Sequence, residues 1–169
     1  LYNENTDNQN KWIEGKENME YTKKIVLCEV GLRDGLQSEK SGLTTDQKVE
    51  LAEDMAAAGF QVIELGSFVS PKAVPQMADT DEVFKRLKPA DGVEYRALIA
   101  NLKGVERAAA CGCKKVKLNV SASTAHNLAN LNRTPEESVA GFGACVEKAN
   151  ECGIGISGSI SMGIRFPVG

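Results

Sequence analysis

The sequence predicts an α/β fold in which parallel strands alternate with helices. Short apolar, β-branched runs recur along the chain, and each is followed by a polar loop and then by apolar residues at helical spacing. Regular alternation of this kind requires parallel strands joined by right-handed crossovers. Both an open doubly wound sheet and a closed eight-stranded barrel satisfy it, and the pattern alone does not choose between them.

The first strand–helix unit occupies residues 25–59. Residues 25–30 (IVLCEV) are typical of a buried strand, and a polar loop follows them. Thr44 or Thr45 can N-cap the next helix, which we expect to end at Gly59. The apolar residues of that helix recur three and four positions apart, which predicts one buried face: Val49, Leu51, Ala52, Met55 and Ala56.

The unit then recurs along the rest of the chain. Further strands are predicted at residues 61–65, 93–100, 114–120 and 154–160, and further helices at residues 80–87, 102–112 and about 134–152. Asn101 can cap the second of these helices. The start of the third is predicted by Thr134 at N-cap, Pro135 at N1 and Glu137 at N3. The alternation within residues 114–120 indicates a strand with one wetter face.

Composition limits the classes of partner. The chain has 169 residues, of which 42% are hydrophobic and 25% charged, as in ordinary soluble domains. A formal net charge of -3 gives no electrostatic footprint for nucleic acid. Charges or glycines interrupt every apolar run well before the length of a membrane span, so we expect no membrane partner.

The cysteines predict reduced thiols rather than disulfides. Their number is odd, and Cys111 and Cys113 are two apart, unlike the C-x-x-C pairs of structural zinc sites. Small buried thiols in a reducing compartment are the simpler interpretation, which predicts a cytoplasmic location.

Residues 1–23 are expected to be a disordered polar leader. They lack the apolar stretch of a secretory signal, and their acidity argues against a mitochondrial presequence. Met19, just before the first apolar run, is the predicted native start.

The loop after the first strand combines opposite charges with glycines on both sides. Asp34 offers a hard carboxylate suited to Mg²⁺ or Mn²⁺, and Arg33 can stabilise negative charge on a substrate oxygen. The alternative is a surface turn in which the two side chains pair loosely. Spacing alone leaves both open.

Two other loops follow strands and carry polar groups. Glu64 ends the second strand, where it can align the arginine, or it can simply pair with a basic neighbour. Residues 119–123 (NVSAS) offer hydroxyls for a carbonyl or carboxylate, or form a capped polar loop. His126 is expected on the surface. Walker, G-x-G-x-x-G and G-x-S-x-G motifs do not occur.

Several segments together resemble one family, the hydroxymethylglutaryl-CoA lyases. The resemblance begins at residues 29–40 (EVGLRDGLQSEK) and covers nearly the whole chain after the leader. Its other segments are residues 62–64, 67–72, 74–79, 101–104 and 136–138. It implies a (β/α)8 TIM barrel to which this chain supplies about the first five strands, with residues 24–169 as the front part of the catalytic domain.

The resemblance also implies an activity and a site. The family cleaves 3-hydroxy-3-methylglutaryl-CoA, an acyl-CoA, to acetyl-CoA and acetoacetate in a retro-Claisen reaction, and a full-length form can be a homodimer. By residue-by-residue matching, Asp34 binds the divalent cation, Mg²⁺ or Mn²⁺, and Arg33 stabilises the enolate-like oxygen. Glu64 supports this site, while Gln37 and Ser67 lie in loops that face the substrate.

Departures from the family pattern limit what this chain is expected to do. Leu32 stands where the family usually has Pro, which predicts a looser turn, and residues 165–169 fit the family only at Pro167. The H-x-H ligands, an Asn ligand and a reactive Cys come from later strands in the family, and His126 is not their equivalent. We therefore expect the polypeptide alone to be inactive, and an open half-barrel with exposed strand edges to aggregate or depend on a partner.

Other interpretations remain open alongside the leading one. A related 3-hydroxyacyl-CoA lyase or an acyl-CoA condensing enzyme would share the Arg-Asp loop. A catalytically silent barrel fragment or partner would keep the fold without the chemistry.

Overall fold

The structure, a computed structural model, describes residues 24–40 and 42–163. The expected leader at residues 1–23, the Met19 start and the departure at residues 165–169 lie outside the described residues.

Five parallel strands form one sheet whose spatial order follows the chain order, β1-β2-β3-β4-β5. The strands are β1 (Cys28–Glu29), β2 (Val62–Ser67), β3 (Glu94–Ile99), β4 (Lys115–Ser121) and β5 (Gly155–Ser161). A doubly wound sheet reverses its strand order at a switch point, whereas a barrel adds each strand beside the last. The sequential order therefore decides between the two architectures that the sequence left open: the chain forms half of a TIM barrel.

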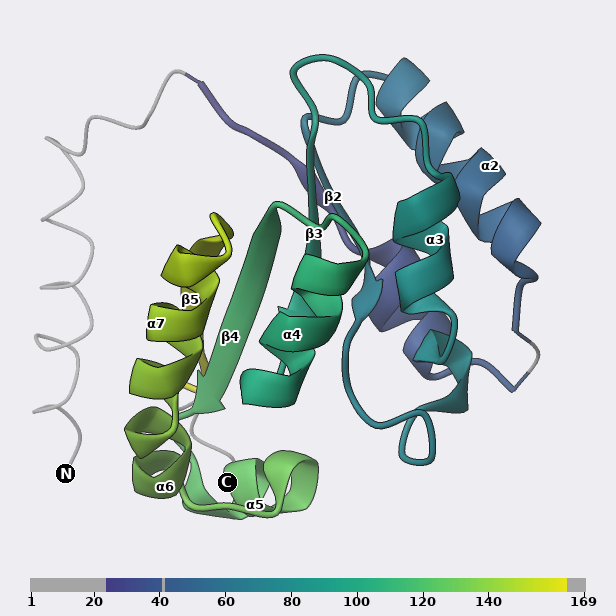
Figure 1. Ribbon diagram of the computed structural model, residues 1–169. Helices are drawn as coiled ribbons and strands as arrows, with labels where there is room; N and C mark the ends of the chain where they lie inside the picture. The colour runs from purple at the N-terminus through teal and green to yellow at the C-terminus, as the bar shows by residue number, and fades with distance from the viewer. Residues whose placement is uncertain (1–23, 41, 164–169) are drawn as a thin grey trace, which may run out of the picture.

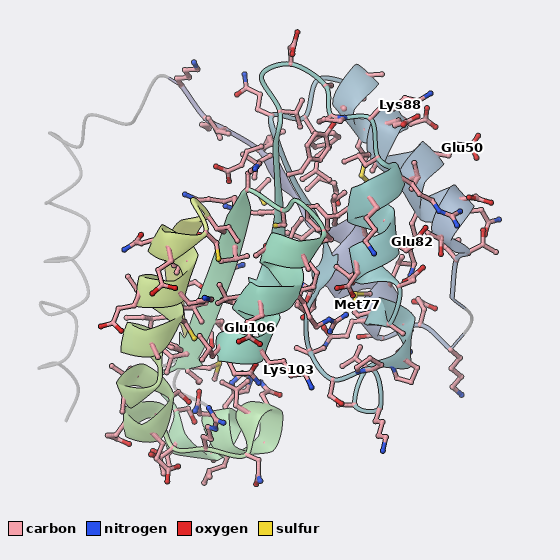
Figure 2. The ribbon with its side chains drawn as sticks, in the orientation of Figure 1. Glu50, Met77, Glu82, Lys88, Lys103 and Glu106 are labelled. Atoms are coloured by element: carbon pink, nitrogen blue, oxygen red, sulfur yellow. The ribbon has the colours of Figure 1, made fainter. Side chains whose placement is uncertain are left out.

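The helices line up along one face of the sheet (Figure 1). They include α2 (Thr45–Ala57), α3 (Thr80–Arg86), α4 (Leu102–Ala110) and α7 (Phe142–Glu151). Their outer sides carry charged residues such as Glu50 on α2 and Lys103 and Glu106 on α4 (Figure 2). Right-handed crossovers that always step in the same direction place every helix on the same side, as a barrel requires. Among the described residues, no helix is long and apolar enough to cross a membrane.

Local capping signals correctly located three of the helix starts. Thr44 caps α2 and forms a capping box with Gln47, and Thr134 forms a second box with Glu137 at the start of α6 (Pro135–Ala140). The Asn101 carboxamide oxygen accepts a hydrogen bond from the Gly104 amide at 3.1 Å. These interactions involve residues three apart in the chain, so they need no tertiary context.

Several details differ from the sequence-based expectations. The predicted strand at residues 25–30 pairs only at Cys28 and Glu29, because β1 is the edge of the described sheet and Ile25 lies 78% exposed. The loop after it contains a π-helical turn, η2 (Gly31–Gly35), and the loop after β4 contains a full helix, α5 (Thr124–Leu131).

The last predicted helix, residues 134–152, is interrupted at Gly141 and forms α6 and α7 instead of one element. A further difference concerns α2: Leu51, expected on its buried face, is 37% exposed, whereas Lys48 is buried and its ammonium pairs with Asp79.

Apolar side chains fill the space between the sheet and its helices. One cluster lies under α2 and α3 and includes Ile63, Leu65 and Val83, and a second lies under α4 and α7 and includes Val116 and Leu118. Because side chains alternate along a strand, the neighbouring positions point to the opposite, concave face of the sheet. That face is where the polar strand residues gather.

Gly66 allows α3 to approach β2 closely, next to an irregularity in the β2–β3 pairing between Glu64 and Gly66. A Cβ atom at Gly66 would lie 2.5 Å from the Thr80 hydroxyl oxygen, which accepts a hydrogen bond from the Ser67 amide and donates one to the Met77 carbonyl. The absence of a side chain at Gly66 thus keeps the strand in place beside α3.

We predict that Gly66→Ala lowers the free energy of unfolding by about 1–3 kcal/mol, since the added methyl group must displace Thr80. Gly143→Ala is the matched control, because a Cβ at that helical position meets no atom within 4 Å. It should leave stability unchanged or raise it by up to about 1 kcal/mol. Urea denaturation measures both, and equal stability of the two variants would contradict the steric argument.

The buried thiols carry a second prediction. All five cysteines are free, and burial raises the pKa of the Cys113 thiol from 9.0 to about 12. The thiol of the unfolded chain ionises at lower pH, so the contribution of Cys113 to stability is complete below pH 9 and is lost as the pH rises toward 12.

At pH 8 we expect iodoacetamide to modify the exposed Cys28 and to leave Cys113 unmodified until the protein is unfolded in denaturant. Mass spectrometry of the labelled peptides gives the result. Equal labelling rates at the two sites in the folded protein would contradict it.

Candidate active site

A buried carboxylate lies at the centre of the concave face. Glu64, the third residue of β2, has no solvent-exposed surface. Its Oε1 accepts a hydrogen bond from Arg33 Nε at 2.5 Å, and its Oε2 accepts one from Lys117 Nζ at 3.4 Å. Arg96 Nε lies 3.6 Å from the same Oε2. A carboxylate this deeply buried is tolerated only when cations and hydrogen bonds replace its water.

Three separate strands and one turn bring these groups together. Arg33 comes from the turn after β1, Glu64 from β2, Arg96 from β3 and Lys117 from β4. Glu64 and Arg96 are direct partners in the β2–β3 register. Arg96 Nε is buried and has no hydrogen-bond partner among the described residues, because 3.6 Å is too long for a hydrogen bond.

The turn η2 holds Arg33 in place. The amides of Arg33 and Asp34 both donate to the Val30 carbonyl, at 3.1 and 2.7 Å. Leu32, where the looser turn was expected, is 1% exposed and packs in the core cluster with Ile63. Burial of this leucine therefore anchors the turn, and the Arg33 side chain projects from it toward Glu64.

Two adjoining hollows open beside Arg33. The larger, about 340 Å³, is bordered by η2, by the ends of β3 and β4, and by α5. The smaller, about 290 Å³, lies between the ends of β3, β4 and β5. Both are lined by Arg33, Leu98, Asn119 and Ser161, so they form one continuous depression at the carboxyl ends of the strands. That end of a parallel barrel is where ligands bind.

Three of the predicted site residues line the larger hollow: Arg33, Asp34 and Gln37. Glu64 lies behind Arg33 and contacts it directly. Ser67 is placed differently. It is the last residue of β2 rather than part of a loop, it is 1% exposed, and its hydroxyl donates to the Leu98 carbonyl at 3.4 Å. Ser67 lines neither hollow, and its role in binding substrate stays a prediction.

The third polar loop of the sequence also reaches the site. Asn119 and Ser121 line the larger hollow, together with His126, whose ring is exposed as expected. Behind them Asn127 is buried: its oxygen accepts from the Ser121 amide, and its amide nitrogen donates to Ser138 Oγ. Asn127 thus joins α5 and α6 to the end of β4.

Sequence reasoning missed Arg96 and Lys117 as site residues. The wetter face predicted for residues 114–120 was the signal for Lys117. Arg96 gave a weaker signal, one of two charges, with Glu94, in the otherwise uncharged strand at residues 93–100. A charge in the middle of a buried strand requires a partner, but the sequence does not say which strand supplies it.

The described residues do not provide a complete set of ligands for a divalent cation. Within residues 24–40 and 42–163, no three His, Cys, Asp or Glu side chains gather in a group that could hold a metal ion. Asp34 supplies one carboxylate, 64% exposed, and its Oδ1 lies 2.5 Å from Arg33 Nη1. Mg²⁺ and Mn²⁺ prefer several oxygen ligands, so Asp34 alone does not make the site.

Comparison with known proteins gives one consistent family. The HMGL-like family model matches residues 24–168. A Pseudomonas aeruginosa protein named 3-hydroxy-3-isohexenylglutaryl-CoA/hydroxy-methylglutaryl-CoA lyase is 43% identical over 149 residues, which are 88% of this chain and 50% of that protein. The mitochondrial hydroxymethylglutaryl-CoA lyase of Homo sapiens is 41% identical over 86% of this chain and 45% of its own length.

Solved structures agree with the fold. An HMG-CoA lyase from Brucella melitensis aligns with a TM-score of 0.79 and 38% identity, over 85% of this chain and 51% of that one. An HMG-CoA lyase from Acinetobacter baumannii, in complex with coenzyme A and 3-methylmalate, aligns with a TM-score of 0.76 and 41% identity, over 80% and 44%. The chain therefore spans about half the length of the relatives it matches.

The charge cluster yields a prediction about stability. Glu64→Gln keeps the size of the side chain but leaves Arg33, Arg96 and Lys117 without a buried anion, so we expect a loss of about 3 kcal/mol in the free energy of unfolding. Glu50→Gln, on the exposed side of α2, is the matched control and should change stability by less than about 0.5 kcal/mol. Chemical denaturation measures both, and a loss at Glu64 no larger than at Glu50 would refute the pairing.

Proposed function

The chain belongs to the HMGL-like family, and from that premise we propose that the protein, in full-length form, cleaves 3-hydroxy-3-methylglutaryl-CoA to acetyl-CoA and acetoacetate. The observation that carries the proposal is the Arg33–Glu64 pair at the base of a hollow where the strands end. The names of the relatives support the carbon–carbon lyase class.

The reaction needs charge to be stabilised at a defined oxygen. A base removes the proton of the tertiary hydroxyl group, and the bond between C2 and C3 of the acyl chain breaks. The C3 oxygen becomes the ketone oxygen of acetoacetate, and the electrons of the broken bond move onto the thioester as an enolate. Protonation of that enolate at carbon gives acetyl-CoA.

Arg33 is suited to stabilise the enolate oxygen. Its Nε is held by Glu64 and its Nη1 by Asp34, while its Nη2 has no hydrogen-bond partner among the described residues, in a side chain that lines both hollows. A fixed guanidinium needs little reorganisation when charge develops, and one such donor contributes about 3–4 kcal/mol to the transition state. Glu64 therefore acts as a positioning residue for Arg33.

We propose Asp34 as one ligand of a divalent cation, Mg²⁺ or Mn²⁺, with the other ligands supplied from beyond the described residues. Bound there, the ion supplies Lewis-acid polarisation of substrate oxygens. Gln37 lines the larger hollow and is proposed to contact the substrate, and the same role is proposed for Ser67.

An acyl-CoA substrate is supported by the coenzyme A bound in the Acinetobacter baumannii relative. We also propose that the full-length protein is a homodimer and that its location is cytoplasmic. The proposed location rests on the free cysteines. A lyase for a related 3-hydroxyacyl-CoA is the second candidate, because the Pseudomonas aeruginosa relative is named for two such substrates.

We predict that Arg33→Gln lowers the kcat of hydroxymethylglutaryl-CoA cleavage by about 10²–10³-fold in full-length protein with Mg²⁺, while the fold is kept. Coupled detection of acetoacetate measures the rate, and circular dichroism checks the fold. Arg86→Gln, which removes an exposed arginine of α3 paired with Glu82 and Asp46, is the control and should retain full activity. Full activity of the Arg33 variant would refute its role.

The 169-residue polypeptide tested alone under the same conditions should show no turnover, because its described residues provide one carboxylate for the metal. Metal-dependent cleavage by that polypeptide as a monomer would contradict this expectation. An inactive full-length protein would refute the lyase proposal itself.

A further inference from the structure

The smaller hollow is lined by hydrogen-bond donors that the chemistry proposed above does not use. Lys117 and Asn119 enter it from β4, and Ser159 and Ser161 enter it from β5. Arg33 forms the boundary with the larger hollow. Barrel interiors are usually filled by branched apolar side chains, so this polar lining needs a separate explanation.

The lining has more donors than acceptors. Among the described residues, the Lys117 ammonium has one hydrogen-bond acceptor, Glu64 Oε2, which is 3.4 Å away and is also approached by Arg96. The Asn119 oxygen accepts from the Ser159 hydroxyl at 2.8 Å, and no described residue accepts from the Asn119 amide nitrogen. The Lys117 ammonium therefore has two further protons, and the Asn119 amide nitrogen has both of its protons, for which no described residue is an acceptor.

The distribution of charge around Lys117 favours a ligand with anionic oxygens that accept hydrogen bonds. The Glu64 carboxylate faces Arg33, Arg96 and Lys117 together. Among the described residues, Glu64 is the only carboxylate near Lys117, and Lys117 shares it with both arginines. Asp34 and Glu94 pair with the two arginines instead. An anionic oxygen placed beside Lys117 would complete the hydrogen bonds of the ammonium group, in a side chain that is only 21% exposed.

We infer that Lys117 and Asn119 form a subsite for a carboxylate, and that this subsite holds the free carboxylate of the acyl group while Arg33 holds the thioester end. The inference rests on the proposed function for the identity of the substrate. It adds a specificity: the hollow favours acyl groups that carry a free acid over those that lack one, because an acyl group without the acid would leave these donors unpaired.

The direct test is binding, which needs no turnover. Isothermal titration calorimetry of 3-hydroxy-3-methylglutarate with the full-length protein should give a Kd that rises by at least about 10-fold in Lys117→Met, the usual effect of losing one charged hydrogen bond. Lys117→Arg should restore the Kd to within about threefold of wild type. Lys115→Met, on the same strand but outside both hollows, should leave it within about twofold.

A second ligand separates a carboxylate subsite from a phosphate subsite. Adenosine 3′,5′-bisphosphate, a probe for the phosphates of coenzyme A, should bind equally well to the wild-type protein and to Lys117→Met. A larger loss for the bisphosphate than for the dicarboxylate would overturn the inference. An unchanged Kd for the dicarboxylate in Lys117→Met, or no binding of it by the wild-type protein, would also overturn it.

If Lys117→Met does not fold, Asn119→Asp serves instead, because a second carboxylate in the hollow should repel the ligand and raise its Kd at least about 10-fold. An unchanged Kd in that variant would overturn the inference. Turnover is measured separately. If the protein has no lyase activity but binds the dicarboxylate in a way that depends on Lys117, the subsite is supported and the proposed function is refuted.

Discussion

The buried Glu64 carboxylate is the constraint on which the rest of this half-barrel depends. A carboxylate without access to water must have cations, and here they come from the turn after β1, from β3 and from β4. The concave face can therefore form only when these strands lie side by side in the observed order. The pairing fixes Arg33, and through Arg33 it fixes the side of the hollow on which chemistry is proposed to occur.

The opposite face of the sheet is apolar and packs against the helices. There the apolar side chains of β2, β3 and β4 pack against α2, α3, α4 and α7, and Gly66 allows α3 close enough for the Thr80 hydroxyl to bond the β2 backbone. Glu64 and Gly66 flank the irregularity in the β2–β3 pairing. Bulges of this kind often occur beside active sites, where they redirect a side chain. One short segment of β2 thus serves the helix layer and the charged cluster at once.

Much of the fold was predictable because its signals are local. Thr44 and Thr134 start helices through contacts three residues away, and the alternation of strands and helices required a parallel sheet. The sequential strand order was not predictable from periodicity, because both architectures share the same pattern. The helix α5 was missed because its Ser123 cap stands in a polar stretch and its eight residues include only two large apolar side chains, Leu128 and Leu131. Leu51 was placed wrongly because spacing does not reveal where the buried stripe of α2 ends.

Only some residues of the candidate site could be predicted from the sequence. Arg33 and Asp34 belong to a long motif after β1, and Glu64 adjoins a second motif in β2, so sequence could single them out, although their roles remain proposals. Arg96 and Lys117 could not be assigned, since their significance lies in a shared partner contributed by another strand. Ser67 illustrates the converse: a residue inside a matching motif has a hydroxyl that bonds the neighbouring backbone rather than opening into the hollow.

The members of the charge cluster are far apart along the chain, and this separation affects how the protein folds. Glu64 is 31 residues from Arg33 and 53 residues from Lys117. Contacts that close loops of this length form slowly, because the entropy of closure is lost before the contact can compensate for it. During synthesis Arg33 and Glu64 both emerge before β4 does, because they precede it in the chain. The carboxylate is therefore only partly neutralised until the fourth strand docks, and the strands cannot settle in a different order without leaving it unpaired.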